Sequence, residues 1–349
     1  MTRRTLIPAL IAATILAVSS CIEPPLHLKQ SMEVLVKVLW KAEVYPDGDK
    51  PNGVTLYFFR DGKFYMEHTT AQVDSCVVKL EPGRYRLYMI SQSPDEYWKM
   101  EFNDMTDFEN ARVSVAETKS SWYSTRSESE VVINNPEMMV AGVSDFFDVT
   151  EDMIERQRQS ATKAGDNIDI YYYTILVPVS PQSIVSQYWI TIYSDNVDML
   201  KAVRASTTGM ARTFYLTQDK TGEEEGTQLV SEWSLTVDDE QHLIGHLDGR
   251  VTTFGFPNGE LPNPGRDSTL NVSTLLVDNK TVEEYRFYVG DKIHLEEPVP
   301  QGYRHLYRII FGSIFEPAIH PERVLPEGGS GFIAGVTDWD EEIDVGVEI

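Results

Sequence analysis

Short segments with alternating apolar and polar residues run along most of the chain, and this pattern constrains the fold more than any other feature. In MEVLVKVLW (32–40) every second residue is apolar, which is the period of a β-strand. The apolar positions on that face are Val34, Val36, Val38 and Trp40. Similar segments, VVKLEPGRYRLYMIS (77–91) and NIDIYYYTILVPVSP (167–181), are interrupted by Gly, Pro, Asn and Asp. We therefore expect an all-β protein built from antiparallel sandwiches, with the 34–40 face buried.

Helix signals are confined to two segments. VTEDMIERQRQ (149–159) has Thr150 as a candidate N-cap followed by acids, and DNVDMLKAVRAST (195–207) is a second candidate. Neither interrupts strands in the regular way of a parallel α/β fold. PVSP (178–181) is the best domain boundary, so we expect one or two short helices within two tandem sandwiches. Their predicted ranges are 32–180 for the N-terminal sandwich and 181–349 for the C-terminal sandwich.

The N-terminal residues have the pattern of an export signal. Two arginines precede an apolar run (6–18) that is shorter than the roughly 20 residues a membrane-spanning helix needs. Val18-Ser19-Ser20-Cys21 then resembles a bacterial lipobox, in which the cysteine is lipidated and becomes the new N-terminus. We therefore predict a signal peptide over residues 1–20, lipidation of Cys21 and a tether over residues 21–31. A plain signal peptide that ends near a cysteine is the alternative.

The charge balance excludes whole classes of partner. The chain has 30 Lys and Arg against 54 Asp and Glu, a formal net charge of −24 at pH 7. Nucleic-acid binding depends on cations that neutralise phosphates, so no nucleic-acid partner is expected. An acidic surface is also repelled by anionic lipid, so membrane attachment has to come from the lipid on Cys21. Cys76 is the only other cysteine, and we expect it to be a buried, inert thiol.

No catalytic, metal or cofactor motif is complete. PDGDKPNG (46–53) begins like a calcium loop but has no Glu at its twelfth position, so a turn is expected. HLIGH (242–246) lacks the Glu of a zinc-protease helix. GGSGF (328–332) has Phe where the nucleophile elbow requires Gly. The sequence therefore predicts no enzyme, no metal and no cofactor.

Several segments together resemble a known family. They are the lipobox, HLKQSMEVLVKVLW (27–40), ASTTGMARTFYL (205–216) and the terminal DWDEEIDVGVEI (338–349). The chain is similar to the Bacteroidetes fimbrillin superfamily, and within it to lipoproteins related to fimbrial anchor and accessory subunits. The resemblance implies two transthyretin-like β-sandwich domains, a lipid-anchored and surface-exposed location at the outer membrane, and fimbrial subunits or other outer-membrane proteins as partners. Strand addition would provide the contacts.

Two details refine what the resemblance implies. Shaft subunits of the superfamily are usually cut after an early arginine, but no arginine lies between Cys21 and Arg60. A lysine-directed cut stays open, yet the pattern favours a subunit that keeps its lipid, hence an anchor, base or accessory protein. The terminal segment (337–349) alternates apolar and acidic residues, so we expect a last strand within the C-terminal sandwich. A strand offered to a neighbouring subunit is the alternative.

The competing function is a carbohydrate-binding surface lipoprotein of a glycan-uptake system. Sugar stacking needs exposed aromatic rings, and Trp98 and Trp122 lie in loop-like or ambiguous sequence. The remaining tryptophans lie in strand patterns and are expected in the core; they are Trp40, Trp189, Trp233 and Trp339. Ser268 lies in a short DST motif (267–269) within a predicted loop, which makes it a weak candidate for O-glycosylation.

Overall fold

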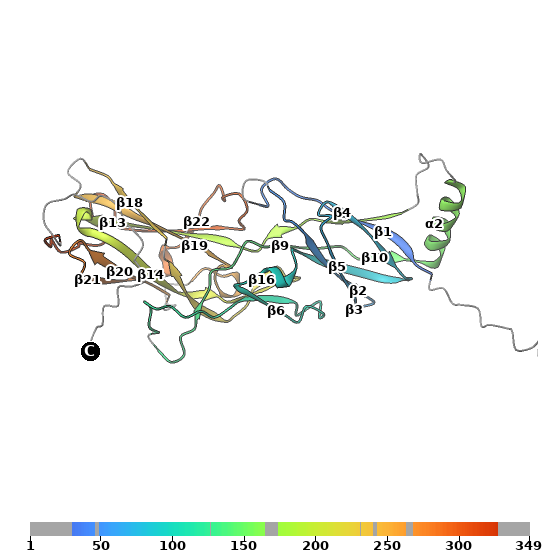
Figure 1. Cartoon of the computed structure of the whole chain (residues 1–349), viewed down its shortest axis with the longest axis horizontal. Coiled ribbons are helices and arrows are strands. Elements are labelled where there is room, and N and C mark those ends of the chain that lie inside the picture. Colours follow the sequence, from blue (N-terminus) through green and yellow to red (C-terminus); the bar gives the residue numbers. More distant parts are fainter. Residues whose placement is uncertain are drawn as a thin grey trace, which may run out of the picture.

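The computed structural model describes residues 30–45, 49–125, 127–164, 174–230, 232–239, 243–262 and 268–326. It is an elongated, mostly β structure in which two sandwiches follow one another along the long axis (Figure 1). The predicted all-β sandwich class is confirmed. One α-helix, α2 (Glu151–Ala164), lies at one end, and Thr150 caps it because Met153 N donates to Thr150 Oγ1 at 3.3 Å.

Strands account for most of the described residues. In chain order they are β1 (Met32–Val38), β2 (Val54–Arg60), β3 (Lys63–Thr70), β4 (Ser75–Leu80), β5 (Gly83–Ser91), β6 (Met100–Asn103), β7 (Arg112–Val115), β8 (Val132–Ile133), β9 (Val140–Val143), β10 (Phe147–Val149), β11 (Ile175–Val179), β12 (Gln182–Ser183), β13 (Ser186–Asp195), β14 (Leu200–Ala211), β15 (Thr213–Tyr215), β16 (Lys220–Thr221), β17 (Glu225–Val230), β18 (Trp233–Val237), β19 (Ile244–Thr253), β20 (Thr269–Leu276), β21 (Val282–Tyr288), β22 (His294–Leu295) and β23 (Leu306–Phe311). Short 3-10 helices are η2 (Pro94–Glu96), η3 (Val197–Met199), η4 (Pro257–Gly259) and η5 (Gly290–Lys292).

The N-terminal sandwich packs a small sheet against a larger one. The small sheet has the order β11-β1-β4, and the larger has the order β12-β9-β5-β2-β3, with β10 beside β5. Val34, Val36 and Val38 of β1 are at most 5% exposed and lie in the core between them. Trp40 packs against the margin of that core, so the predicted inward face of the first strand is confirmed. Burial raises the pKa of the Cys76 thiol to about 11, which keeps this core cysteine protonated.

The C-terminal sandwich also consists of two sheets. Their strand orders are β21-β20-β14-β17-β8 and β18-β19-β13-β23-β22. The central strand β13 pairs antiparallel with β19 and parallel with β23. Its alternate residues Tyr188, Ile190 and Ile192 are fully buried in the core between the sheets. The face of the β18-β19-β13-β23-β22 sheet that points away from this core is called its outer face.

A further sheet is shared by the two halves of the chain. Its order is β16-β15-β7-β6, so β7 from the first half pairs with β15 from the second, with Val113 opposite Phe214. This shared sheet covers the second face of the larger N-terminal sheet, and Tyr57, Tyr88 and Phe214 belong to one separate core there. Strand β8, also from the first half, lies parallel to β17. The division at residue 180 stays a prediction, but the structure links the two sandwiches through a common core.

One predicted element is wrong and others fall outside the described residues. The second candidate helix (195–207) is instead η3 followed by β14, a strand that lies between β20 and β17. A central strand buries both faces, so its apolar residues lose the simple alternation that marks a half-buried strand. Cys21, Trp339 and the terminal segment (337–349) lie outside the described residues. Among the described helices, none has the length and apolar character needed to cross a membrane.

Candidate functional site at the end of the C-terminal sandwich

The two tryptophans predicted for sugar stacking lie in different surroundings. Trp98 is 89% exposed, beside Glu137, whose carboxylate accepts hydrogen bonds from the backbone N–H groups of Trp98 and Lys99. Trp122 is half-buried, with the Tyr123 ring edge-on and the Arg204 guanidinium 5.1 Å from its centroid. No ring contact joins the two tryptophans, both of which are described. They therefore form no common stacking platform, and a sugar-binding role for either one stays a prediction.

Trp189, expected in the core, lies on the outer face of its sheet. The Arg250 guanidinium from β19 lies 4.3 Å from the ring centroid, and the Arg308 guanidinium from β23 lies 5.6 Å from it. Because β19 and β23 flank β13 on opposite sides, both faces of the indole ring are covered. The expectation was wrong because an alternating pattern shows that two faces exist but does not show which one is buried.

Ser268 is only 3% exposed, and its hydroxyl donates a hydrogen bond to the Thr208 carbonyl at 2.8 Å. A glycan on Ser268 would have to break that hydrogen bond and displace the surrounding chain. This geometry disfavours the glycosylation hypothesis, although residues 263–267, directly before Ser268, lie outside the described part of the chain.

The histidine of the HLIGH segment that the structure describes is His246 on β19. Its Nδ1 lies 2.7 Å from Asp238, and its Nε2 lies 3.4 Å from Asp248. Asp248 also accepts a hydrogen bond from the Thr191 hydroxyl at 2.5 Å. Over the described ranges, no group of three or more His, Cys, Asp or Glu residues is arranged to hold a metal ion. The cluster is a polar network of His246, Asp238, Asp248 and Thr191 on the sheet.

The chain that follows β23 forms the most elaborate polar site. This C-terminal segment (312–326) lies at the left end of the molecule, far from β1 and α2 (Figure 1). It returns along β13, where Ala318 N donates to the Tyr193 carbonyl at 2.8 Å and Ile319 forms a parallel bridge with Ser194. Ile319 is fully buried in the C-terminal core. An apolar contact at Ile319 therefore holds the segment directly before the side-chain contacts of residues 320–323.

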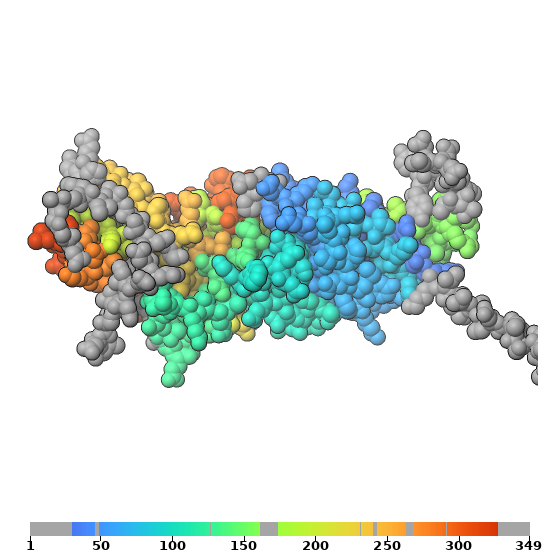
Figure 2. All heavy atoms as spheres, in the orientation of Figure 1, coloured from blue at the N-terminus to red at the C-terminus, as the bar shows by residue number. Residues whose placement is uncertain are grey.

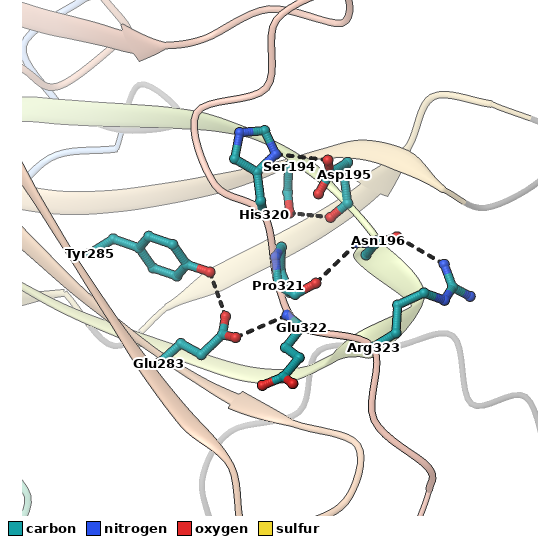
Figure 3. Close-up of polar contacts among 9 residues, drawn as sticks. All are labelled: Ser194, Asp195, Asn196, Glu283, Tyr285, His320, Pro321, Glu322 and Arg323. Atoms are coloured by element: carbon teal, nitrogen blue, oxygen red, sulfur yellow. Dashed lines mark hydrogen bonds and ion pairs between the residues drawn. The ribbon is translucent and has the colours of Figure 1, made fainter.

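The turn after β13 supplies the first set of polar contacts (Figure 3). Asn196, with a left-handed φ of 46°, donates from Nδ2 to the Pro321 carbonyl at 3.0 Å. Its Oδ1 accepts a hydrogen bond from Arg323 at 2.8 Å, and the same guanidinium lies 3.1 Å from Asp198. His320 Nδ1 lies 2.7 Å from the Asp195 carboxylate. These contacts tie the segment to the sheet that contains β13.

The opposite sheet supplies the second set of contacts. Glu322 N donates to the Glu283 carboxylate on β21 at 2.9 Å, and the Tyr285 hydroxyl donates to the same carboxylate (Figure 3). Burial, with the Glu283 charge in addition, raises the pKa of Tyr285, so it stays a neutral donor. Since β21 is an edge strand, the C-terminal segment bridges the two sheets at the end of the sandwich. Sequence reasoning missed this site because its residues lie in separate segments without a motif.

Replacement of Asn196 by Asp is expected to loosen the segment. The variant keeps the acceptor for Arg323 and tolerates a left-handed φ, but it places a carboxylate oxygen against the Pro321 carbonyl. The loss of a paired donor should cost about 1–3 kcal/mol locally. Native-state hydrogen exchange should show reduced protection of amides in residues 318–324. Asn258→Asp, at another left-handed asparagine (φ 59°), is the control, and equal protection in both variants would contradict the role of Asn196.

The fold defines the class: an all-β protein of two sandwiches, whose described residues include no cluster of His, Cys, Asp or Glu that could hold a metal ion. The sequence model of the family called Domain of unknown function (DUF5119) matches residues 20–231, and the chain belongs to that family. No curated protein matches the chain in sequence.

Several solved structures are similar to this chain to different degrees. A candidate adhesin from Bacteroides ovatus ATCC 8483 has a TM-score of 0.52 and 13% identity, covering 85% of this chain and 94% of that one. The fimbrial anchor protein Mfa2 from Porphyromonas gingivalis has a TM-score of 0.44 and 11% identity, covering 80% and 90%. A candidate adhesin from Bacteroides thetaiotaomicron VPI-5482 has a TM-score of 0.46 and 8% identity, covering 75% and 82%. The structural neighbours are thus fimbrial proteins and candidate adhesins of Bacteroidetes, as the sequence resemblance predicted.

Proposed function

We propose that this chain is a surface lipoprotein that acts as an anchor or accessory subunit of a fimbria-like filament. A lipid on Cys21 ties the tether to the outer membrane, and strand-mediated contacts join the protein to neighbouring subunits. Its partners are fimbrial subunits or other outer-membrane proteins. The proposed domains are the sandwiches of residues 32–180 and 181–349, and the proposal includes no catalytic step.

The observation that carries the proposal is that an elongated body has different parts of the chain at its two ends. β1, the first strand after the proposed tether, lies in the N-terminal sandwich, and the C-terminal segment lies at the far end of the other sandwich (Figure 1). The shared sheet joins the two sandwiches through a packed core, which resists bending between them. A rigid body attached at one end suits a protein that links a membrane to a filament. The fold shared with a candidate adhesin agrees with this role.

Replacement of Cys21 by Ala is expected to release the protein from the membrane fraction. The net charge of −24 disfavours attachment to anionic lipid, so removal of the lipid should remove the attachment. Fractionation of cells followed by immunoblotting measures the distribution. Cys76→Ala is the matched control and should stay with membranes. If the Cys21 variant remains membrane-bound, the lipoprotein assignment is wrong.

Co-purification tests the filament role itself. The native protein is extracted from outer membranes in mild detergent and crosslinked, and the attached proteins are identified by mass spectrometry. The expected result is a ladder of crosslinked species. Each species should contain fimbrillin-like subunits attached to one copy of this chain. Recovery with a transporter and glycan-binding lipoproteins would instead favour carbohydrate binding, and Trp98 and Trp122 would then be the residues to replace.

A further inference from the structure

The first part of the C-terminal segment is a closed loop with two buried ends. This loop, the Phe315 loop (residues 312–318), begins after Phe311, which is 5% exposed, and ends before Ile319, which is fully buried. Both flanking residues belong to the core of the C-terminal sandwich. The loop therefore leaves the core and returns to it within seven residues, so its position relative to the sandwich is fixed.

Backbone contacts fix the shape of the Phe315 loop as well. Ser313 N donates to the Glu316 carbonyl at 2.8 Å, and Glu316 N donates to the Ser313 carbonyl and hydroxyl, both at 3.1 Å. Gly312 has a φ of +75°, and a Cβ there would lie 2.6 Å from Ala318 N and 2.7 Å from the Glu316 carbonyl oxygen. The close approach requires glycine. Such a preformed loop loses little conformational entropy when it binds a partner.

The tip of this rigid loop is apolar. Phe315 is 97% exposed and Ile314 is 45% exposed. Loops at a surface are usually polar, and a fixed, exposed aromatic side chain is the kind of anchor that contributes most of the binding energy at protein interfaces. The red atoms at the left extremity of the molecule in Figure 2 belong to the segment after β23 and lie at the surface. The tip is therefore accessible to a large partner.

The charges near the loop indicate the chemistry of that partner. Glu316 and Glu322 are exposed in the same segment, whereas the Asp195 carboxylate at the end of the neighbouring strand is already paired with His320. The nearby cation Arg323 is already bound to Asp198. Acidic groups around an apolar tip are repelled by anionic lipid and are complementary to a pocket rimmed by Lys or Arg. Since the whole chain carries a net charge of −24, a second copy is also disfavoured by charge repulsion.

We propose that the Phe315 loop docks into an apolar pocket, rimmed by basic residues, on the filament subunit that this chain contacts. The inference rests on the proposed filament role and identifies which part of the molecule makes the contact. Phe315 is the anchor, Ile314 adds apolar area, and Gly312 maintains the loop. The contact is made by side chains and is separate from any strand addition.

The test compares variants of the full-length, lipidated chain in its native host. We measure the amount of fimbrillin-like subunit that co-purifies with each copy after crosslinking. Phe315→Ala should reduce it about tenfold or more, as expected for loss of an aromatic anchor. Phe315→Leu, which keeps an apolar side chain, should retain most of it. Trp98→Ala, at an aromatic side chain with 89% exposure in the first half of the chain, should change it less than twofold.

The outcomes separate the docking inference from the filament role. If the wild-type chain retains filament subunits and Phe315→Ala retains them equally, only the docking inference is overturned. If the wild-type chain retains no such subunit, the filament role fails and the inference fails with it.

Vesicles of phosphatidylethanolamine and phosphatidylglycerol provide a second readout with the Cys21→Ala chain. Binding to them that depends on Phe315 would overturn the protein partner. Equal melting temperatures of the variants establish that folding is intact.

Discussion

Replacement of Phe214 by Ala is expected to lower the free energy of unfolding by about 3–5 kcal/mol and to destabilise both sandwiches together. Phe214 is 1% exposed and lies in β15, where it contacts the Phe254 ring. Its core also includes Tyr57 and Tyr88 from the N-terminal half. A cavity at this position removes contacts from both halves at once, since the shared sheet has strands from each.

Denaturant titration with hydrogen exchange of individual peptides measures this coupling. In each protein, peptides from β2 and from β20 should lose protection at the same denaturant concentration. This midpoint concentration should be lower in the Phe214 variant than in the wild type. Phe146→Ala is the control because that phenylalanine is 57% exposed, and it should cost less than about 1 kcal/mol. If the β2 peptides kept their wild-type midpoint in the Phe214 variant, the two sandwiches would be independent units.

Replacement of Gly255 by Ala is expected to cost about 2–4 kcal/mol. Gly255 follows β19 and has a φ of +109°, a conformation that L-residues rarely adopt. A Cβ at this position would lie 2.7 Å from the hydroxyl of the buried Tyr307, so steric overlap adds to backbone strain. Its carbonyl also accepts a hydrogen bond from Ala211 N at 2.9 Å, at the point where the chain passes from β19 to η4.

Gly259→Ala separates the two causes. Gly259 has a φ of +70°, and nothing lies within 4 Å of the Cβ that would be added, so the substitution introduces backbone strain without overlap. We expect it to cost about 1 kcal/mol. Thermal unfolding monitored by circular dichroism measures both variants. Equal losses of stability in the Gly255 and Gly259 variants would show that overlap with Tyr307 contributes nothing to the cost.

The candidate site shows the limit of local patterns. The strand pattern identified Trp189 as part of a strand, but the ring lies between Arg250 and Arg308 on the outer face. The contacts of Asn196 with Pro321 and Arg323 join positions more than 120 residues apart. No spacing rule connects such residues, because their proximity is created by the pairing of β13 and β23. Trp98, by contrast, lies in loop-like or ambiguous sequence, and it is 89% exposed.

Sequence alone determined local secondary structure in this protein. The alternation in residues 32–38 and the cap at Thr150 predicted a strand with a buried face and a helix, because side-chain period and capping depend on neighbouring residues. Only the tertiary structure decided that β7 pairs with β15, that residues 200–211 form a central strand, and that the C-terminal segment bridges two sheets. The physical reason is that strand partners are chosen by the fit of distant surfaces, and the energy of that fit is absent from any short stretch of sequence.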